Sequence, residues 1–329
     1  MQHTIPSLVI SLDFELMWGV RDKHSIGSYG ENVLGVREAI PAMLRLFKQY
    51  DVKATWAAVG MLLFRDKREL LKSLPQQVPG YHKAGLSPYS LDYLNQLGTD
   101  ENSDPYHFGL SLAEQIVACP GMELGSHTFC HYYCLEKGQN AEQFRADLQT
   151  AVAATRRLAP NPISIVFPRN QVRTDYLAVC AEMGFRAFRG NEASWIYRES
   201  ADEDQGLFQR GLRLFDSYVN LSGDNGLVPS LQLGLVNVPS SRFLRPHSPA
   251  LRWLEPLRVH RIVKAMSHAI LAGRSFHLWW HPHNFGIQLR ENLAALESIL
   301  AHFGRLRERH GMQSMTMGEM AANSARNFP

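Results

Sequence analysis

The sequence predicts an α/β fold in which parallel strands alternate with helices along all 329 residues. Short, nearly continuous apolar runs such as 7–12 and 163–167 are typical of strands that are buried on both faces. Longer segments with apolar residues at helical spacing, such as 36–50 and 141–159, stand between those runs. Because no linker interrupts this alternation, we expect right-handed crossovers within one domain that spans residues 1–329.

In the first half of the chain, turn residues and changes in hydrophobic period set the boundaries of the elements. The first strand begins at Ser7 and is closed by Asp13 and Glu15, and a glycine-containing loop separates it from the helix 36–50. A strand, a short helix, a short strand that ends in Gly125 and Ser126, a long helix and a β-branched strand ended by Pro168 follow. We place these five elements at 53–60, 111–120, 121–126, 141–159 and 163–168.

The second half continues the same alternation with a helix at 172–184 and a short strand at 185–190. Region 200–230 gives no clear assignment, although 206–219 has helical periodicity. We then expect a strand with its exit loop, a helix whose Gly273 suits the position after its end, a strand, a long helix, and a short final strand and helix. These elements lie at 234–244, 256–273, 275–286, 287–311 and 313–325.

Residues 65–110 interrupt the alternation of strands and helices. Prolines and glycines are scattered there among polar residues, which predicts an insertion lying over one end of the domain. The insertion contains His82 and His107, which we expect to be solvent-exposed or packing histidines.

The composition is that of a globular protein and excludes several classes of function. Hydrophobic residues make up 45% of the chain, and the formal net charge is only +3, so no nucleic-acid-binding surface is predicted. The sequence has no run of about 18 apolar residues, and its N-terminus lacks the features of a secretion signal. Four cysteines at irregular spacing do not form a disulfide framework. We therefore expect a protein of the reducing cytoplasm that does not span a membrane.

Two acidic residues, Asp13 and Glu15, stand at the end of the first apolar run. Side chains two positions apart lie on one face of a strand, so both carboxylates can enter the same site. Carboxylates in an apolar segment are costly to bury without a cation or a hydrogen-bond donor, and a metal ion would supply the charge. The alternative is that both acids lie in solvent, in a loop after the strand.

Two histidines, His127 and His131, follow the strand that ends at Ser126. If the backbone turns helically there, residues four apart lie on one face and both imidazoles can reach one metal ion. The alternative is a pair of packed or surface histidines. Because Cys130 and Cys134 alternate with them, a structural Cys/His zinc site is conceivable, but no second such pair follows. We expect all four cysteines to be buried or inert thiols.

Reactive side chains end four of the predicted strands. The acids follow the first strand, the histidine pair follows another, Arg169 and Asn170 follow 163–168, and His281 follows the late strand. In a closed barrel the carboxyl ends of parallel strands meet on one face, where such folds place their active sites. The sequence has no G-x-S-x-G elbow, P-loop or strand-associated G-x-G-x-x-G, which argues against serine hydrolases, NTPases and dinucleotide-dependent enzymes.

These motifs, in this order, resemble the polysaccharide deacetylase family, also called NodB homology proteins or carbohydrate esterase family 4. The motifs are SLDFE, HTFCH, FPRN, NEASW and HLWWHPH, at residues 11–15, 127–131, 167–170, 191–195 and 277–283. The resemblance covers nearly the whole chain, and HTFCH is its most specific motif.

The resemblance implies a distorted (β/α) barrel, similar to a TIM barrel, with about seven parallel strands. It also implies a divalent metal ion, expected to be zinc with cobalt or nickel as alternatives, and it makes His127 and His131 ligands. The family's first motif ends in adjacent aspartates, a base followed by a ligand, whereas Phe14 separates the two acids here. We assign Asp13 as the base and Glu15 as the metal ligand, with the exchanged roles as the alternative.

The resemblance implies further roles late in the chain. His281 matches the family's late histidine and would protonate the leaving amine, with His283 as the alternative for this role and a substrate-binding residue otherwise. Arg169 resembles the arginine that pairs with the catalytic aspartate, although here proline precedes the arginine.

Tryptophans are the expected sugar-stacking residues. We assign Trp195 and Trp280 to substrate binding and expect one of the adjacent pair Trp279 and Trp280 to belong to the core, because neighbouring strand residues face opposite ways.

The sequence thus predicts a metal-dependent hydrolase that removes an N-acyl group, with acetyl expected, from an amino sugar. We expect the sugar to be a nucleotide-linked or lipid-linked precursor of a surface polysaccharide. A backbone N–H near 130–133 would help to stabilise the oxyanion. One alternative is hydrolysis of another C–N bond, in a formamide or a ureide such as allantoin. The other is an inactive relative that binds carbohydrate or metal.

Overall fold

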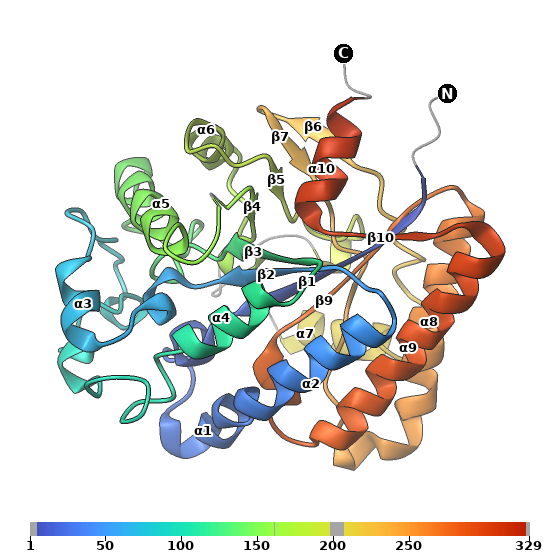
Figure 1. Cartoon of the computed structure of the whole chain (residues 1–329), viewed down its shortest axis with the longest axis horizontal. Helices are drawn as coiled ribbons and strands as arrows, with labels where there is room; N and C mark the ends of the chain where they lie inside the picture. The colour runs from blue at the N-terminus through green and yellow to red at the C-terminus, as the bar shows by residue number, and fades with distance from the viewer. Residues whose placement is uncertain (1–4, 161, 198–206, 327–329) are drawn as a thin grey trace.

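The computed structural model describes residues 5–160, 162–197 and 207–326, and its centre is a ten-stranded, mostly parallel sheet (Figure 1). The strands are β1 (Ser7–Phe14), β2 (Ala54–Ala58), β3 (Met122–Ser126), β4 (Ser164–Ile165), β5 (Ala187–Phe188), β6 (Ser230–Gln232), β7 (Leu235–Asn237), β8 (Arg242–Phe243), β9 (Phe276–Trp280) and β10 (Gln313–Met315). They pair in the order β6-β7-β5-β4-β3-β2-β1-β9-β8, with β10 beside β1. Only β6 and β7 form an antiparallel pair among the described strands.

One segment closes this sheet into a ring. β7 pairs with β5, and only four residues, 238–241, separate it from β8, which pairs with β9. Between the two strands, Val238 N–H donates to Phe188 O at 2.9 Å, and Ser241 N–H donates to His277 O at 2.8 Å. The ring therefore consists of β1, β2, β3, β4, β5, the β7–β8 segment and β9. This arrangement confirms the expected distorted (β/α) barrel of about seven parallel strands.

Helices surround the ring on its outer side and, in the case of the last helix, at one end (Figure 1). They are α1 (Ile26–Leu34), α2 (Val36–Gln49), α3 (Lys67–Lys72), α4 (Leu110–Ala118), α5 (Ala141–Thr155), α6 (Thr174–Glu182), α7 (Leu207–Asp216), α8 (Glu255–Leu271), α9 (Leu289–His310) and α10 (Met317–Ala325). Each helix that the sequence predicts is confirmed within a few residues. No described helix combines the length and the apolar character that crossing a membrane requires.

Helix α1 is a correction, because the sequence predicts a loop there. Two glycines at 27 and 30 lower the intrinsic helix propensity of this stretch. Tertiary packing overrides that preference: a Cβ at Gly30 would lie 3.1 Å from the Tyr106 ring, so the glycine permits a close approach of α1 to residues 65–110.

Residues 65–110 pack against the turn that follows β1. Met17 N–H donates to Tyr106 O at 3.0 Å, and the Trp18 indole donates to His107 O at 2.7 Å. His107 is itself buried, with Nδ1 lying 2.8 Å from an Asp104 oxygen. As expected for this histidine, its role is packing. The other predicted histidine of this region, His82, is exposed.

The core has two parts. A large apolar layer fills the space between the strands and the outer helices. A smaller cluster contains barrel residues such as Val9, Ala57, Val166 and Val236, together with three methionines and an alanine from 315–321. Helix α10 therefore plugs the amino-terminal end of the barrel, and the carboxyl-terminal end is left to polar side chains.

Candidate metal centre and active site

The two acids at the carboxyl end of the first strand point into the barrel. Ser11, Asp13 and Glu15 stand at alternate positions along β1 and its exit, and all three are buried. Only 3% of Asp13 and 4% of Glu15 is exposed, so the alternative that both acids lie in solvent is wrong.

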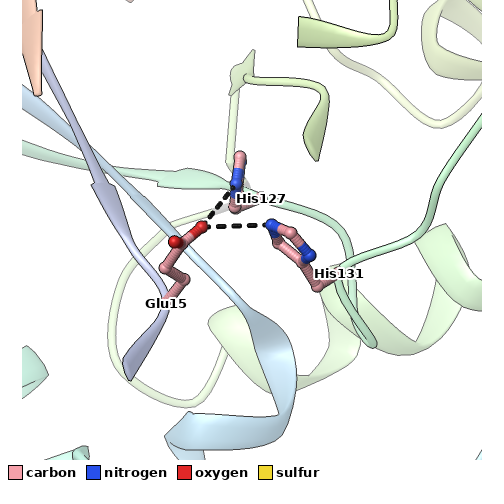
Figure 2. A group of neighbouring side chains, drawn as sticks. All are labelled: Glu15, His127 and His131. Atoms are coloured by element: carbon pink, nitrogen blue, oxygen red, sulfur yellow. Dashed lines mark ion pairs between the residues drawn. The ribbon is translucent and has the colours of Figure 1, made fainter. Parts of the chain in front are cut away.

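Glu15, His127 and His131 converge on one point (Figure 2). Glu15 Oε2 lies 3.3 Å from His127 Nε2 and 3.1 Å from His131 Nε2. Two ligands held ~2.1 Å from one ion at a tetrahedral angle are ~3.4 Å apart, so this spacing suits ligands of a single ion. All three side chains are buried, and within the described part of the chain they form the one cluster that meets this geometry.

The hydrogen bond of His127 and the neutral ring of His131 both suit metal ligands. His127 Nδ1 donates to Val166 O at 2.8 Å, which turns Nε2 toward Glu15. That Nε2 is buried, and no described residue offers it a hydrogen bond of normal geometry. Burial lowers the pKa of His131 to about 4, so its ring is neutral near pH 7, the form that binds metals.

A loop, and not a helical turn, brings the two histidines together, which corrects the expected mechanism. Thr128 and His131 have left-handed backbones, with φ of 63° and 60°. The buried carboxylate of Asp147 on α5 accepts hydrogen bonds from Phe129 N at 2.7 Å and Cys130 N at 3.1 Å. The spacing of four residues works because α5 holds this loop in place.

The cysteines of this stretch do not join the cluster. Cys130 and Cys134 are buried in the apolar layer, and burial raises the pKa of both thiols. Both are free thiols, as are Cys119 and Cys180. Buried, protonated thiols are poor metal ligands, which argues against the Cys/His zinc alternative.

Asp13 forms a buried, bidentate salt bridge with Arg189 from the end of β5. Arg189 Nη1 lies 2.6 Å from Oδ1 and Nη2 lies 2.8 Å from Oδ2. Arg189 Nη2 also donates to Asn170 at 2.8 Å, and its guanidinium lies 4.2 Å from the Trp279 ring centroid. Burial raises the pKa of Asp13, but Arg189 and nearby histidines lower it by more, so this carboxyl is ionised at neutral pH.

The expected partner of Asp13, Arg169, is therefore wrong. Arg169 follows Pro168 with a left-handed φ of 55° and pairs with Asp22, and its guanidinium lies 4.2 Å from the Tyr133 ring centroid. This backbone directs it to the rim of the site. Alternation along the predicted strand 185–190 could have indicated Arg189, because positions 187 and 189 share the face that points into the barrel.

Two late histidines complete the group. His281 Nε2 lies 3.6 Å from Asp13 Oδ2 and 3.8 Å from Glu15 Oε1. His283 Nε2 lies 3.9 Å from Glu15 Oε1, and the two imidazoles stack with centroids 5.0 Å apart. Burial and the charge of His281 lower the pKa of His283 to about 3. His281 is the more exposed of the two, with 24% of its side chain accessible, and it alone approaches both acids.

The tryptophan assignment needs correction. Trp279 lines the site, whereas Trp280 is fully buried and contacts Met43 and Phe285 in the outer core. The reason is the alternation along β9, which turns 277, 279 and 281 inward and 280 outward. Trp195 is 63% exposed and is not among the residues that line the cavity.

These side chains open into a cavity of ≈ 340 Å³ at the carboxyl end of the barrel. Its volume suits a group the size of one sugar residue or smaller. The lining residues are Asp13, Glu15, Gly19, Val20, Lys23, His24, His131, Arg169, Asn170, Arg213, Phe243, Trp279, His281, His283 and Asn284.

Comparisons with known proteins agree with this picture. Residues 32–188, nearly half of the chain, match the family described as Polysaccharide deacetylase. No curated protein shows significant similarity to the sequence.

Solved structures share the fold. A Mycobacterium smegmatis protein named as a polysaccharide deacetylase superposes with a TM-score of 0.61 at 14% identity, covering 100% of this chain and 94% of its own. The PuuE allantoinase gives 0.58 at 11% identity, covering 98% of this chain and 91% of its own. A branching enzyme of the GH57 type from Pyrococcus horikoshii superposes with a TM-score of 0.56 at 12% identity, covering 96% of this chain and 70% of its own. The family match over residues 32–188 and the shared barrel both agree with the resemblance of the sequence motifs to the polysaccharide deacetylase family.

Proposed function

We propose that the protein is a metal-dependent hydrolase that removes an N-acyl group, with acetyl expected, from an amino sugar. The observation that carries the proposal is the convergence of Glu15, His127 and His131 beside Asp13 and His281. Glu15 and the two histidines would hold a divalent ion, expected to be zinc. When bound, this ion would polarise the acyl carbonyl and lower the pKa of water in the site.

The protein's own side chains divide the proton transfers between them. Asp13, kept ionised by Arg189, accepts the proton of the attacking water. His281 reaches both acids and solvent, so it donates a proton to the leaving amine. The N–H groups of residues 129 and 130 donate to Asp147, and those of 132 and 133 donate to Thr128 and Tyr81. The backbone donor for the oxyanion would therefore be the N–H of His131.

Charge on the cavity wall supports an anionic substrate. Three basic side chains, Lys23, Arg169 and Arg213, line the cavity beside Asp13 and Glu15. A cationic wall attracts negatively charged ligands such as the diphosphate of a nucleotide-linked sugar. We therefore propose an activated precursor of a surface polysaccharide as the substrate.

The first test measures metal content and acetate release together. The parent protein should bind about one equivalent of divalent metal and release acetate from N-acetylated sugars, including nucleotide sugars. His127→Ala and His131→Ala should lose the metal, while Asp13→Asn should keep it and lose at least about 100-fold in rate. His260→Ala, at an exposed position of α8, is the matched control.

Other outcomes would point elsewhere. A parent protein that neither contains nor takes up metal would contradict the proposal. Turnover of allantoin or a formamide in place of acetylated sugars would identify the alternative C–N hydrolase. Sugar binding without turnover, unaffected by Asp13→Asn, would identify an inactive relative.

A further inference from the structure

A series of hydrogen bonds runs through the barrel beneath Asp13. It begins at Ser11 and His277, two residues that have no role in the reaction proposed above. Ser11 on β1 and His277 on β9 are both fully buried. His277 Nε2 lies 2.8 Å from Ser11 Oγ, and Arg189 Nη1 donates to the same oxygen at 3.0 Å. Arg189 then holds both oxygens of Asp13.

Which atom donates in each of these hydrogen bonds is fixed. His277 Nδ1 lies 3.1 Å from Val238 O, and because a carbonyl only accepts, Nδ1 must carry the proton. Burial, reinforced by the charge of Arg189, lowers the pKa of His277 to about 3, so the ring is neutral and Nε2 is an acceptor. The Ser11 hydroxyl donates to that nitrogen and turns its oxygen lone pairs toward Arg189.

We propose that Ser11 and His277 are positioning residues, which fix the guanidinium of Arg189 and thereby the plane of the Asp13 carboxylate. The inference rests on the proposed role of Asp13. Arg189 donates a hydrogen bond from Nη1 to Ser11 and one from Nη2 to Asn170, and the face of Trp279 lies against its guanidinium. Because the salt bridge is bidentate, a tilt of the guanidinium turns the carboxylate with it and moves Oδ2 relative to His281.

The setting of this pair favours a role beyond filling space. Val9, Ala57 and Val166 belong to an apolar cluster inside the barrel. A buried serine and histidine are costly compared with apolar residues unless their hydrogen bonds are complete. Both ring nitrogens and the hydroxyl are partnered here, and the chain ends on the one arginine that orients Asp13.

The first experiment compares Ser11→Ala with Ser164→Ala. Ser164 is a fully buried serine of the parallel strand β4, and its hydroxyl has no hydrogen-bond partner among the described residues. Losing a hydrogen bond to a charged group should lower kcat of Ser11→Ala about tenfold, with KM and metal content unchanged. Ser164→Ala should keep the parent rate. Equal rates for the two variants would overturn the inference.

The second experiment separates positioning from structural bracing at His277. The amide of His277→Gln reaches the place of Nε2 and can still accept from Ser11, whereas His277→Asn keeps only a donor near Val238 O. Positioning predicts that the glutamine variant retains most of kcat and the asparagine variant falls about tenfold. If His277 only stabilises the 235–243 segment, the asparagine variant keeps more of kcat than the glutamine variant, and the inference fails.

A readout without substrate keeps this inference distinct from the proposed function. Nitrogen-15 NMR of the parent should show His277 as the neutral Nδ1–H tautomer, and Ser11→Ala should shift the Arg189 side-chain signals. A His277 ring that is charged or protonated at Nε2 would contradict the proposed hydrogen bonds, even in a fully active enzyme. Unchanged Arg189 signals in Ser11→Ala would contradict them as well. If no N-acyl substrate is turned over, the proposed function fails, and these spectra still decide whether Ser11 and His277 hold Arg189.

Discussion

Arg189 and Arg169 both follow short strands, yet only Arg189 enters the barrel. The prediction that Asp13, Glu15, His127 and His131 are neighbours is confirmed. Each pair has a fixed spacing along the chain, and both pairs follow strands whose carboxyl ends meet on one face of the barrel. The arginine could not be predicted in the same way. Which strand-end side chain reaches Asp13 depends on where β5 lies relative to β1 across the barrel.

Replacing Arg189 should therefore damage catalysis more than replacing Arg169. Lysine cannot make the bidentate contact, so Arg189→Lys should lower kcat by about 100-fold or more and leave bound metal unchanged. Arg169→Lys, at the rim, should alter kcat less than about threefold. Steady-state kinetics and elemental analysis of both variants provide the measurement. A greater loss of kcat in Arg169→Lys would restore the assignment that the sequence suggested.

At the scale of elements, the histidine loop shows why motif spacing does not predict conformation. The spacing of His127 and His131 fits a helical turn, but the structure uses a loop with two left-handed residues. The carboxylate of Asp147, a residue of the next helix, imposes this shape by accepting two backbone N–H groups. A contact between the loop and α5 therefore decides how the ligands meet.

Asp147→Asn should loosen this loop. An asparagine oxygen can satisfy one of the two N–H donors, while its NH₂ group faces the other, so a buried donor loses its partner. We expect metal affinity to fall about tenfold, because supporting residues of this kind orient the ligands. Competition with a chelator measures the affinity. Glu142→Gln, at an exposed position of α5, should bind metal as tightly as the parent protein. An equally small change of metal affinity in Asp147→Asn would contradict this account.

At the scale of the whole molecule, the alternating pattern of the sequence predicts parallel strands and outer helices, and the resemblance to the deacetylase family adds the barrel. Apolar runs and helical periodicity are local, so β1, β9 and α9 could be recognised directly. The antiparallel strand β6 pairs with β7 across a two-residue turn, whereas the closure through 235–243 depends on contacts between distant segments. The closing segment is also tied outward, because Arg242 on β8 forms a buried salt bridge with Asp216 on α7.

This salt bridge predicts how stability depends on pH. Burial raises the pKa of Asp216, but Arg242 and a set of hydrogen bonds lower it by more, so the folded-state pKa lies below the ordinary value of 3.8. The pair therefore stabilises the fold above about pH 4, and this contribution is lost as the pH falls further. Asp216→Asn should lower the free energy of unfolding by about 3 kcal/mol at pH 7, and by less at pH 3.5.

Urea denaturation of the parent and the variant at both pH values measures the difference. Asp175→Asn, which removes an exposed partner of Arg173, should change the free energy of unfolding by less than about 1 kcal/mol. A difference between parent and Asp216→Asn that stays constant from pH 7 to pH 3.5 would contradict the pKa argument.

The central place of β1 has a consequence for how the protein is made. β1 leaves the ribosome long before two of its partners, because β9 and β10 begin only at Phe276 and Gln313. During most of translation the strand that carries Asp13 can pair with β2 alone, and its other edge stays open. The site can therefore be assembled only after β9 has been made, and nascent chains that stop before β9 expose an apolar strand edge that favours aggregation.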